Sequence, residues 1–181
     1  LGGILSAYEL DPDQRYVAMA IDLGDRLLKS FDTPTGIPYG SIDLANGNNP
    51  GGRCSMATAG SLQLEFQYLS DITGDRKYQD AALYTFEQLQ VIKKEFPGLF
   101  PTLLLLDKLE FKDKVPVYGI AGRSDSFYEY LLKMYIATGI DRYKNWYLES
   151  ARVSIVNQAI RKHILVEKDG YVFGPNLVGD K

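Results

Sequence analysis

Two acidic residues that could do chemistry, Asp125 and Glu129, lie four positions apart, and Arg123 stands just before them. On a helix this spacing places both carboxylates on one face, about one turn apart. Residues 131–136 are mostly apolar and predict the buried body of that helix. Two acids and an arginine at the start of a helix are typical either of carboxylate chemistry or of a helix cap with its counter-ion. The spacing alone leaves both interpretations open.

Four motifs, including this one, resemble a known enzyme family. They read LGGILSAY at 1–8, FDTPTGIPY at 31–39, GSLQLEF at 60–66 and GRSDSFYEY at 122–130. Together, and in this order, they resemble glycoside hydrolase family 47, the class I α-1,2-mannosidases that trim high-mannose N-glycans. Because four separate motifs agree, the resemblance is specific, whereas any one of them alone would be weak.

The resemblance implies an enzyme that hydrolyses terminal α-1,2-linked mannose from high-mannose N-glycans on glycoproteins, with inversion. It implies Ca²⁺ as cofactor, with its principal ligand outside this chain. It also implies a lumenal place in the secretory pathway, at the endoplasmic reticulum or Golgi membrane, or secretion, with any membrane anchor in a missing N-terminal segment. Two alternatives stay open: an EDEM-like protein that recognises mannose glycans in endoplasmic-reticulum-associated degradation with weak or no hydrolysis, and a non-catalytic scaffold of helical hairpins.

The resemblance also assigns site residues. Asp125 corresponds to one of three essential acids of the family, and the other two lie outside this chain. Arg123, Glu129, Glu65 and Tyr39 correspond to the substrate cleft, where the tyrosine could stack on a sugar ring. Each has a plainer alternative: a structural ion pair for the arginine, water-exposed helix acids for the two glutamates, and a loop that closes a hairpin for the tyrosine.

Composition bounds the other possibilities. The chain has 181 residues, 45% hydrophobic and 24% charged, which is ordinary for a globular domain. Its net charge of -3 and the lack of a basic block argue against a nucleic-acid partner. Cys54 and His163 are its only cysteine and histidine, so no metal-ligand cluster is expected in this chain. We expect Cys54 to be inert and His163 to be a cation at a helix C-terminus. No apolar run approaches a membrane span, and the chain reads as an internal piece of a larger protein.

Helical periodicity and turn residues predict an all-α fold with a few short strands. The expected helices cover residues 1–10, 12–31, 55–72, 75–95, 124–137 and 141–164. The expected strands cover 41–44, 103–106 and 115–118, with a hairpin at 166–173.

An internal repeat organises these elements. Tyr78 follows Tyr16 by 62 residues, and Tyr143 follows Tyr78 by 65, each at the start of the second helix of a pair. A repeated αα-hairpin predicts a toroid whose inner helices alternate with outer ones. It matches the (α/α)7 barrel that the resemblance implies, with about three hairpins in a single partial catalytic domain over residues 1–181. We expect the helices starting near 55 and 124 to be inner and those near 12, 75 and 141 to be outer.

Overall fold

The computed structural model describes residues 1–49, 51–92, 96, 98–107, 117–156, 166–168, 171–173 and 177–178, with side chains up to residue 152. The helices are α1 Gly2–Leu10, α2 Gln14–Leu28, the short 3-10 helix η1 Lys29–Phe31, α3 Met56–Ala59, α4 Gln63–Thr73, α5 Lys77–Val91, α6 Asp125–Thr138 and α7 Asp141–Val156. The strands are β1 Arg53–Ser55, β2 Leu103–Leu105, β3 Val117–Tyr118, β4 Val166–Lys168, β5 Tyr171–Phe173 and β6 Leu177–Val178. None of the described helices is long and apolar enough to cross a membrane.

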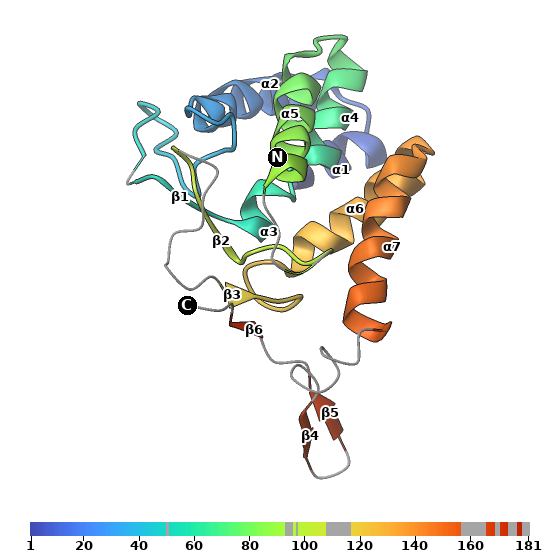
Figure 1. The fold of residues 1–181 in the computed structure, drawn as a ribbon. Helices are drawn as coiled ribbons and strands as arrows, with labels where there is room; N and C mark the ends of the chain where they lie inside the picture. The colour runs from blue at the N-terminus through green and yellow to red at the C-terminus, as the bar shows by residue number, and fades with distance from the viewer. Residues whose placement is uncertain are drawn as a thin grey trace.

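Three αα-hairpins, α1/α2, α4/α5 and α6/α7, form the body of the structure (Figure 1). Their first helices adjoin in chain order, because α1 contacts α4 and α4 contacts α6. Among the second helices, α2 packs on both α4 and α5. The fold is therefore the predicted all-α arc of hairpins, in which the helices that follow residues 55 and 124 share one layer. Helix α1 belongs to that same layer.

The caps of two hairpins repeat each other. Helices α4 and α6 both end at a glycine in the left-handed conformation, Gly74 with φ 74° and Gly139 with φ 69°. The preceding Thr73 and Thr138 each donate their hydroxyl to the carbonyl four residues earlier, at 2.6 Å in both cases. A glycine reaches this conformation without the strain that a side chain would add, so it ends each helix at the same place. The caps are 65 residues apart, as Tyr78 and Tyr143 are.

Some boundaries differ from the sequence prediction because of local polar contacts. The N-cap of α2 is Asp13, whose carboxylate accepts from the Arg15 N–H at 2.8 Å, so the helix begins at Gln14 rather than at residue 12. Capping at Asp13 satisfies one of the free N–H groups of the first turn.

The predicted strand at 41–44 is not formed. The Asp43 carboxylate accepts from the Ala45 N–H at 2.8 Å and from the Asn46 side-chain amide at 2.7 Å. These contacts fold the segment into a turn, since a short Asp side chain offers the backbone an alternative to a strand ladder.

The helix expected over 55–72 is broken between α3 and α4. The first turn of α3 is held by neighbouring segments, because Met56 N–H donates to Thr102 O at 3.2 Å and Ala57 N–H donates to Arg123 O at 2.8 Å. Gly60 then ends α3 against Phe127, where an added Cβ would lie only 2.3 Å from the ring. Contacts that come from distant parts of the chain thus set this break.

Short strands tie the loops together. The predicted strands at 103–106 and 115–118 appear as β2 and β3, but each pairs with a different partner: β2 with β1, and β3 with β6, both antiparallel. The sequence prediction missed β1 and β6. The predicted hairpin at 166–173 is confirmed by the antiparallel pairing of β4 with β5. The predicted helix ends at 93–95 and 157–164 lie outside the described residues.

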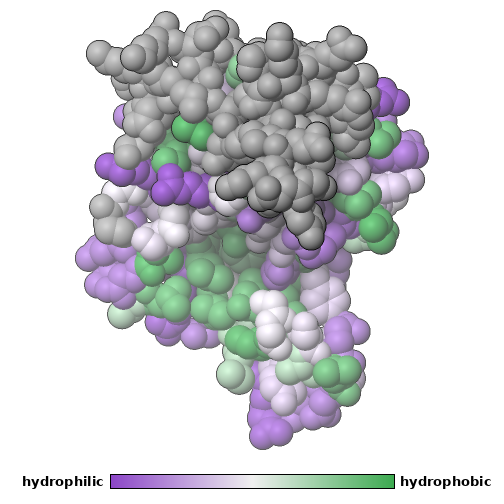
Figure 2. Space-filling view, turned by 90° about the horizontal axis from the view of Figure 1, so that it is seen from below, coloured by the Kyte–Doolittle hydropathy of each residue, from purple (hydrophilic) through white to green (hydrophobic). Residues whose placement is uncertain are grey.

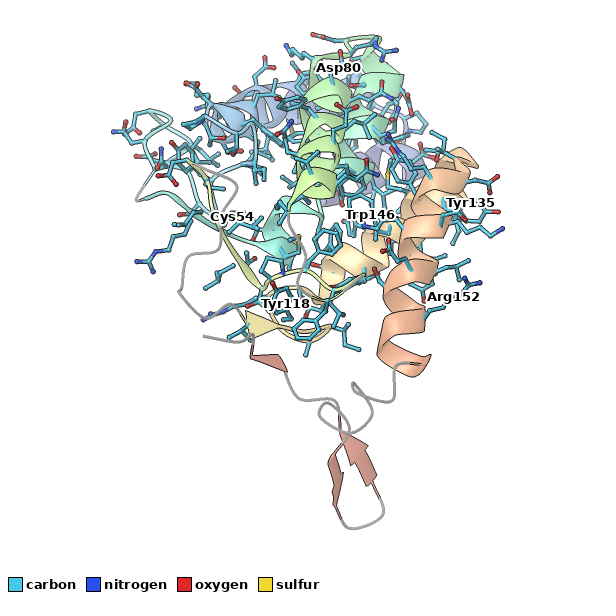
Figure 3. The ribbon with its side chains drawn as sticks, in the orientation of Figure 1. Cys54, Asp80, Tyr118, Tyr135, Trp146 and Arg152 are labelled. Carbon is cyan, nitrogen blue, oxygen red and sulfur yellow. The ribbon has the colours of Figure 1, made fainter. Side chains whose placement is uncertain are left out.

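An aromatic core lies behind α6. The Phe127 ring meets those of Phe86, Phe100 and Trp146 at centroid distances of 4.9–6.1 Å, and all four side chains are buried. Figure 3 shows Trp146 reaching into this core from α7. A second core joins α1, α2, α4 and α5 around Phe66. Packing on this scale holds the start of α6 firmly in place.

Candidate functional site

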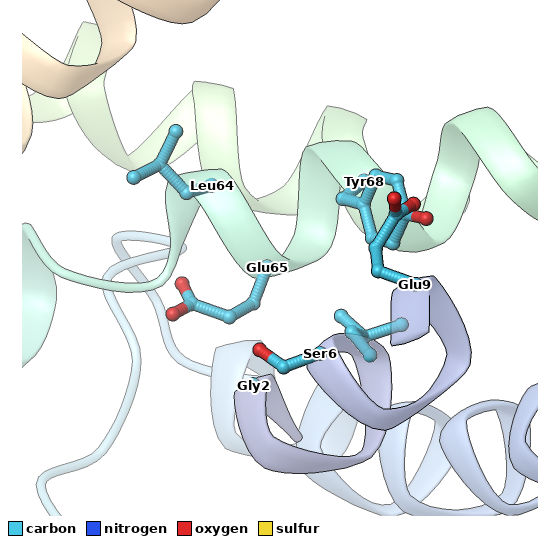
Figure 4. Close-up of a pocket in the computed structure, with 7 residues that line it drawn as sticks. Gly2, Ser6, Glu9, Leu64, Glu65 and Tyr68 are labelled. Atoms are coloured by element: carbon cyan, nitrogen blue, oxygen red, sulfur yellow. The ribbon is translucent and has the colours of Figure 1, made fainter. Parts of the chain in front are cut away.

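The candidate site lies where the first helices of the three hairpins meet. Glu65 projects from the first turn of α4 toward α1, where it lies over Gly2 (Figure 4). An added Cβ at Gly2 would stand 3.4 Å from its Oε1. The Tyr130 hydroxyl of α6 donates to the same Oε1 at 2.9 Å. Gly2, Glu65 and Tyr130 therefore form a row across α1, α4 and α6.

The second oxygen of Glu65 is free. Oε2 is buried and has no hydrogen-bond partner among the described residues. A buried carboxylate oxygen without a donor is costly, and it can accept hydrogen bonds from a ligand. This favours the substrate-cleft interpretation of Glu65 over a water-exposed flank residue.

A pocket of about 220 Å³ opens beside this carboxylate, between α1 and α4. Its lining consists of Gly2, Leu5, Ser6, Glu9, Leu64, Glu65 and Tyr68. Two carboxylates and two hydroxyl-bearing side chains in an otherwise apolar pocket suit a ligand that presents hydroxyl groups beside a carbon skeleton. Ser6 and Glu9 were not predicted from the sequence, although their spacing of three residues on a helix places them on one face.

Asp125 is the first residue of α6 and its side chain is exposed. No donor or cation among the described residues contacts its carboxylate. The preceding N-cap residue, Ser124, donates its hydroxyl to the Ala121 carbonyl at 3.1 Å and to that of Gly119, instead of capping the helix. The cap-and-counter-ion alternative for these residues is therefore not what the structure shows, and the Asp125 carboxylate stays available for chemistry.

Glu129 forms an ion pair within its own helix. Its Oε1 lies 2.5 Å from Lys133 Nζ, and both side chains are about half exposed. Lys133 also stands over the Tyr130 ring, 5.3 Å from its centroid. The sequence analysis did not name Lys133, yet the four-residue spacing from an acid to a lysine is a known signal for such a pair. Helix α6 thus carries Asp125, which has no ion-pair partner among the described residues, and one turn later Glu129, which is paired with Lys133.

Tyr130 stays a protonated donor at neutral pH. Burial raises its pKa first, and the hydrogen bond to Glu65 and the charges of Glu65 and Glu129 raise it further. A neighbouring negative charge disfavours loss of the phenolic proton, and so does low solvation. Tyr130 therefore remains the donor and Glu65 the acceptor of the hydrogen bond between them.

Arg123 has an unusual backbone. Its φ is 76°, the only positive φ found for a residue other than glycine in the part of the chain described. Such a conformation is strained and is enriched at functional sites. Its carbonyl accepts from Ala57 N–H at 2.8 Å, while its exposed side chain forms no ion pair with a described residue. The structural ion-pair alternative thus has no support from the described side chains.

Two other residues from the sequence analysis, Tyr39 and Cys54, lie apart from this row. Tyr39 is partly buried against the aromatic core, and its N–H donates to the Ser30 carbonyl at 2.9 Å, so its stacking on a sugar stays a prediction. Cys54 is buried, and burial raises its pKa to about 12. His163 lies outside the described residues.

The fold and the site together define an α/α-toroid protein whose inner layer carries carboxylates. A model described as Glycosyl hydrolase family 47 matches residues 1–176. The chain therefore belongs to glycosyl hydrolase family 47.

Named relatives agree with this. Mannosyl-oligosaccharide 1,2-alpha-mannosidase MNS1 of Arabidopsis thaliana is 44% identical over 144 residues, 75% of this chain and 25% of that protein. The endoplasmic reticulum mannosyl-oligosaccharide 1,2-alpha-mannosidase of Saccharomyces cerevisiae is 37% identical over 182 residues, 92% of this chain and 32% of that protein. The solved alpha-1,2-mannosidase from Trichoderma reesei has a TM-score of 0.81 and 26% identity, covering 98% of this chain and 40% of that one. The chain thus spans about a quarter to a third of the length of these curated relatives.

Proposed function

We propose that the protein containing this chain hydrolyses terminal α-1,2-linked mannose from high-mannose N-glycans. The observation that carries the proposal is the uncompensated Asp125 carboxylate at the start of α6, close in sequence to the strained Arg123. The names of the relatives support the substrate class. In this proposal Asp125 is a catalytic acid, acting directly or through a water molecule.

The geometry of α6 limits the partner of Asp125. Inverting glycosidases hold two carboxyl groups roughly 6.5–9.5 Å apart, so that a water fits between the base and the sugar. Glu129 is a poor partner, because it lies one helical turn away and is already paired with Lys133. The second carboxylate of the reaction would therefore come from another part of the protein. Inversion is what the family resemblance implies.

The remaining site residues would hold the sugar. Glu65 would accept a hydrogen bond from a mannose hydroxyl through its free Oε2, and Arg123 would donate to sugar oxygens. Glu129, held by its ion pair with Lys133, is proposed to contact the sugar as well. Tyr39 is proposed to stack on a sugar. These roles fit a hydroxyl-rich substrate, which offers many donors and acceptors and an apolar ring face.

Calcium is the cofactor that the family resemblance implies. The described residues contain no group of three or more His, Cys, Asp or Glu side chains that could hold one metal ion. The family resemblance places its principal ligand in another part of the protein. We also propose a lumenal place in the secretory pathway, where N-glycans are trimmed.

The test uses the full-length protein and Manα1-2Man. Release of free mannose, with the β-anomer appearing first by NMR, is the expected result of inverting hydrolysis. A protein that binds the disaccharide but never releases mannose would instead be a recognition protein, and the proposed hydrolysis would be wrong.

A further inference from the structure

Helix α4 and the turn just before it contact α6 at positions that the repeat makes equivalent. Ser61 donates to Ser126 at 2.7 Å, and Tyr130 donates to Glu65 at 2.9 Å. Both pairs are separated by 65 residues, the same interval as the two helix caps. The two helices therefore run side by side in one register, and the serine pair joins the turn just before α4 to the first turn of α6.

The two contacts differ in what they leave free. The hydrogen bond between Ser61 and Ser126 joins two neutral hydroxyl groups. The second contact uses one oxygen of a charged side chain and leaves the other, Oε2 of Glu65, buried without a described partner. A glutamate side chain has three rotatable bonds, and fixing it costs conformational entropy. A hydrogen bond to a charged acceptor is strong enough to offset that cost.

Each end of this contact is held. Tyr130 cannot swing freely, because it is partly buried and Lys133 covers its ring. On the other side of the carboxylate, α1 presents Gly2, whose missing side chain leaves room for Glu65 and for the pocket beside it. The carboxylate is therefore oriented by Tyr130 from α6 and bounded by α1.

We propose that Tyr130 is a positioning residue, which binds Oε1 of Glu65 and so aims Oε2 at a hydroxyl group of the sugar. This inference rests on the proposed function, because Glu65 must contact the substrate. Tyr130 itself need not touch the sugar. Without its hydroxyl the carboxylate would sample several rotamers, and the substrate would lose an oriented acceptor.

The test is a double-mutant cycle in the full-length protein, assayed on Manα1-2Man. We expect Tyr130→Phe to lower kcat/KM roughly tenfold to a hundredfold, the range set by one hydrogen bond to a charged group. In a Glu65→Ala background the same change should cost less than about twofold, because the group that Tyr130 orients is gone. Gly2→Val, which crowds the same carboxylate from α1, should lower kcat/KM in the same Glu65-dependent way.

Two controls separate positioning from helix packing. Ser61→Ala loosens the same pair of helices without touching Glu65, and Tyr135→Phe removes a hydroxyl farther along α6; both should keep kcat/KM within about twofold of the parent. Thermal unfolding checks that every variant is folded. If Tyr130→Phe is harmless in an active parent, or equally damaging with and without Glu65, the positioning role is wrong and the proposed function stands. If the parent itself releases no mannose, both proposals fail.

Discussion

Gly60 is the position where the structure makes its sharpest prediction about stability. It ends α3 at φ -101°, which any residue can adopt, so an alanine there meets no backbone strain. Its Cβ would instead stand 2.3 Å from Cδ2 and 3.1 Å from Cβ of Phe127. That ring cannot move aside, because it is fully buried and packed by Phe86, Phe100 and Trp146.

Gly60→Ala should therefore destabilise the full-length protein by about 1–3 kcal/mol, the usual cost of overpacking a core. The matched control is Gly3→Ala in α1, where an added Cβ meets nothing within 4 Å and the helix gains up to about 1 kcal/mol. Chemical denaturation measures both. Phe127→Leu should recover part of the loss in the Gly60→Ala background. If Gly60→Ala is as stable as Gly3→Ala, the packing described for Phe127 is wrong.

Three further predictions concern stability and reactivity. Lys77 and Tyr78 donate hydrogen bonds to the Asp25 carboxylate and lower its pKa from 3.8. The free energy of unfolding of the parent should therefore exceed that of Asp25→Asn by up to about 1 kcal/mol at neutral pH. That advantage should shrink as pH falls through the lowered pKa, and equal melting temperatures at pH 7 would contradict it. Cys54, with its pKa raised to about 12, should react with a thiol reagent only after unfolding, and rapid labelling of the folded protein would refute this. The chain expressed alone should aggregate or oligomerise, since Ile136 is 74% exposed and Figure 2 shows apolar side chains around a hollow; a monomer that melts cooperatively would count against it.

Local signals explain how much of the fold could be predicted from the sequence. The helices and their glycine caps follow from periodicity and from Gly74 and Gly139, which act within a few residues. The break at Gly60 could not be predicted in this way, because it depends on Phe127, which follows 67 residues later. Strand β1 has three residues and exists only through its pairing with β2. Such short strands are set by their neighbours rather than by propensity.

Some residues of the candidate site could likewise be predicted from local sequence signals, and others could not. Asp125, Glu129 and Glu65 could be singled out from motifs and from acids in apolar surroundings. That Glu129 is compensated by Lys133 could have been read from their spacing. The contact of Tyr130 with Glu65 was accessible only by applying the 65-residue repeat to the inner helices, which requires knowing that these helices adjoin. The strained backbone of Arg123 has no signal in the residue type itself.

The central claim is that the free carboxylate at the start of α6 does chemistry. The most direct measurement is mannose release from Manα1-2Man by the full-length protein carrying Asp125→Asn, which keeps the volume and removes the charge. Because the described residues give this carboxylate no cap or ion pair, the variant should unfold at the parental temperature yet work about 10²–10⁴-fold more slowly. A variant that melts several degrees lower but keeps near-parental turnover would show that Asp125 is structural and would contradict the claim.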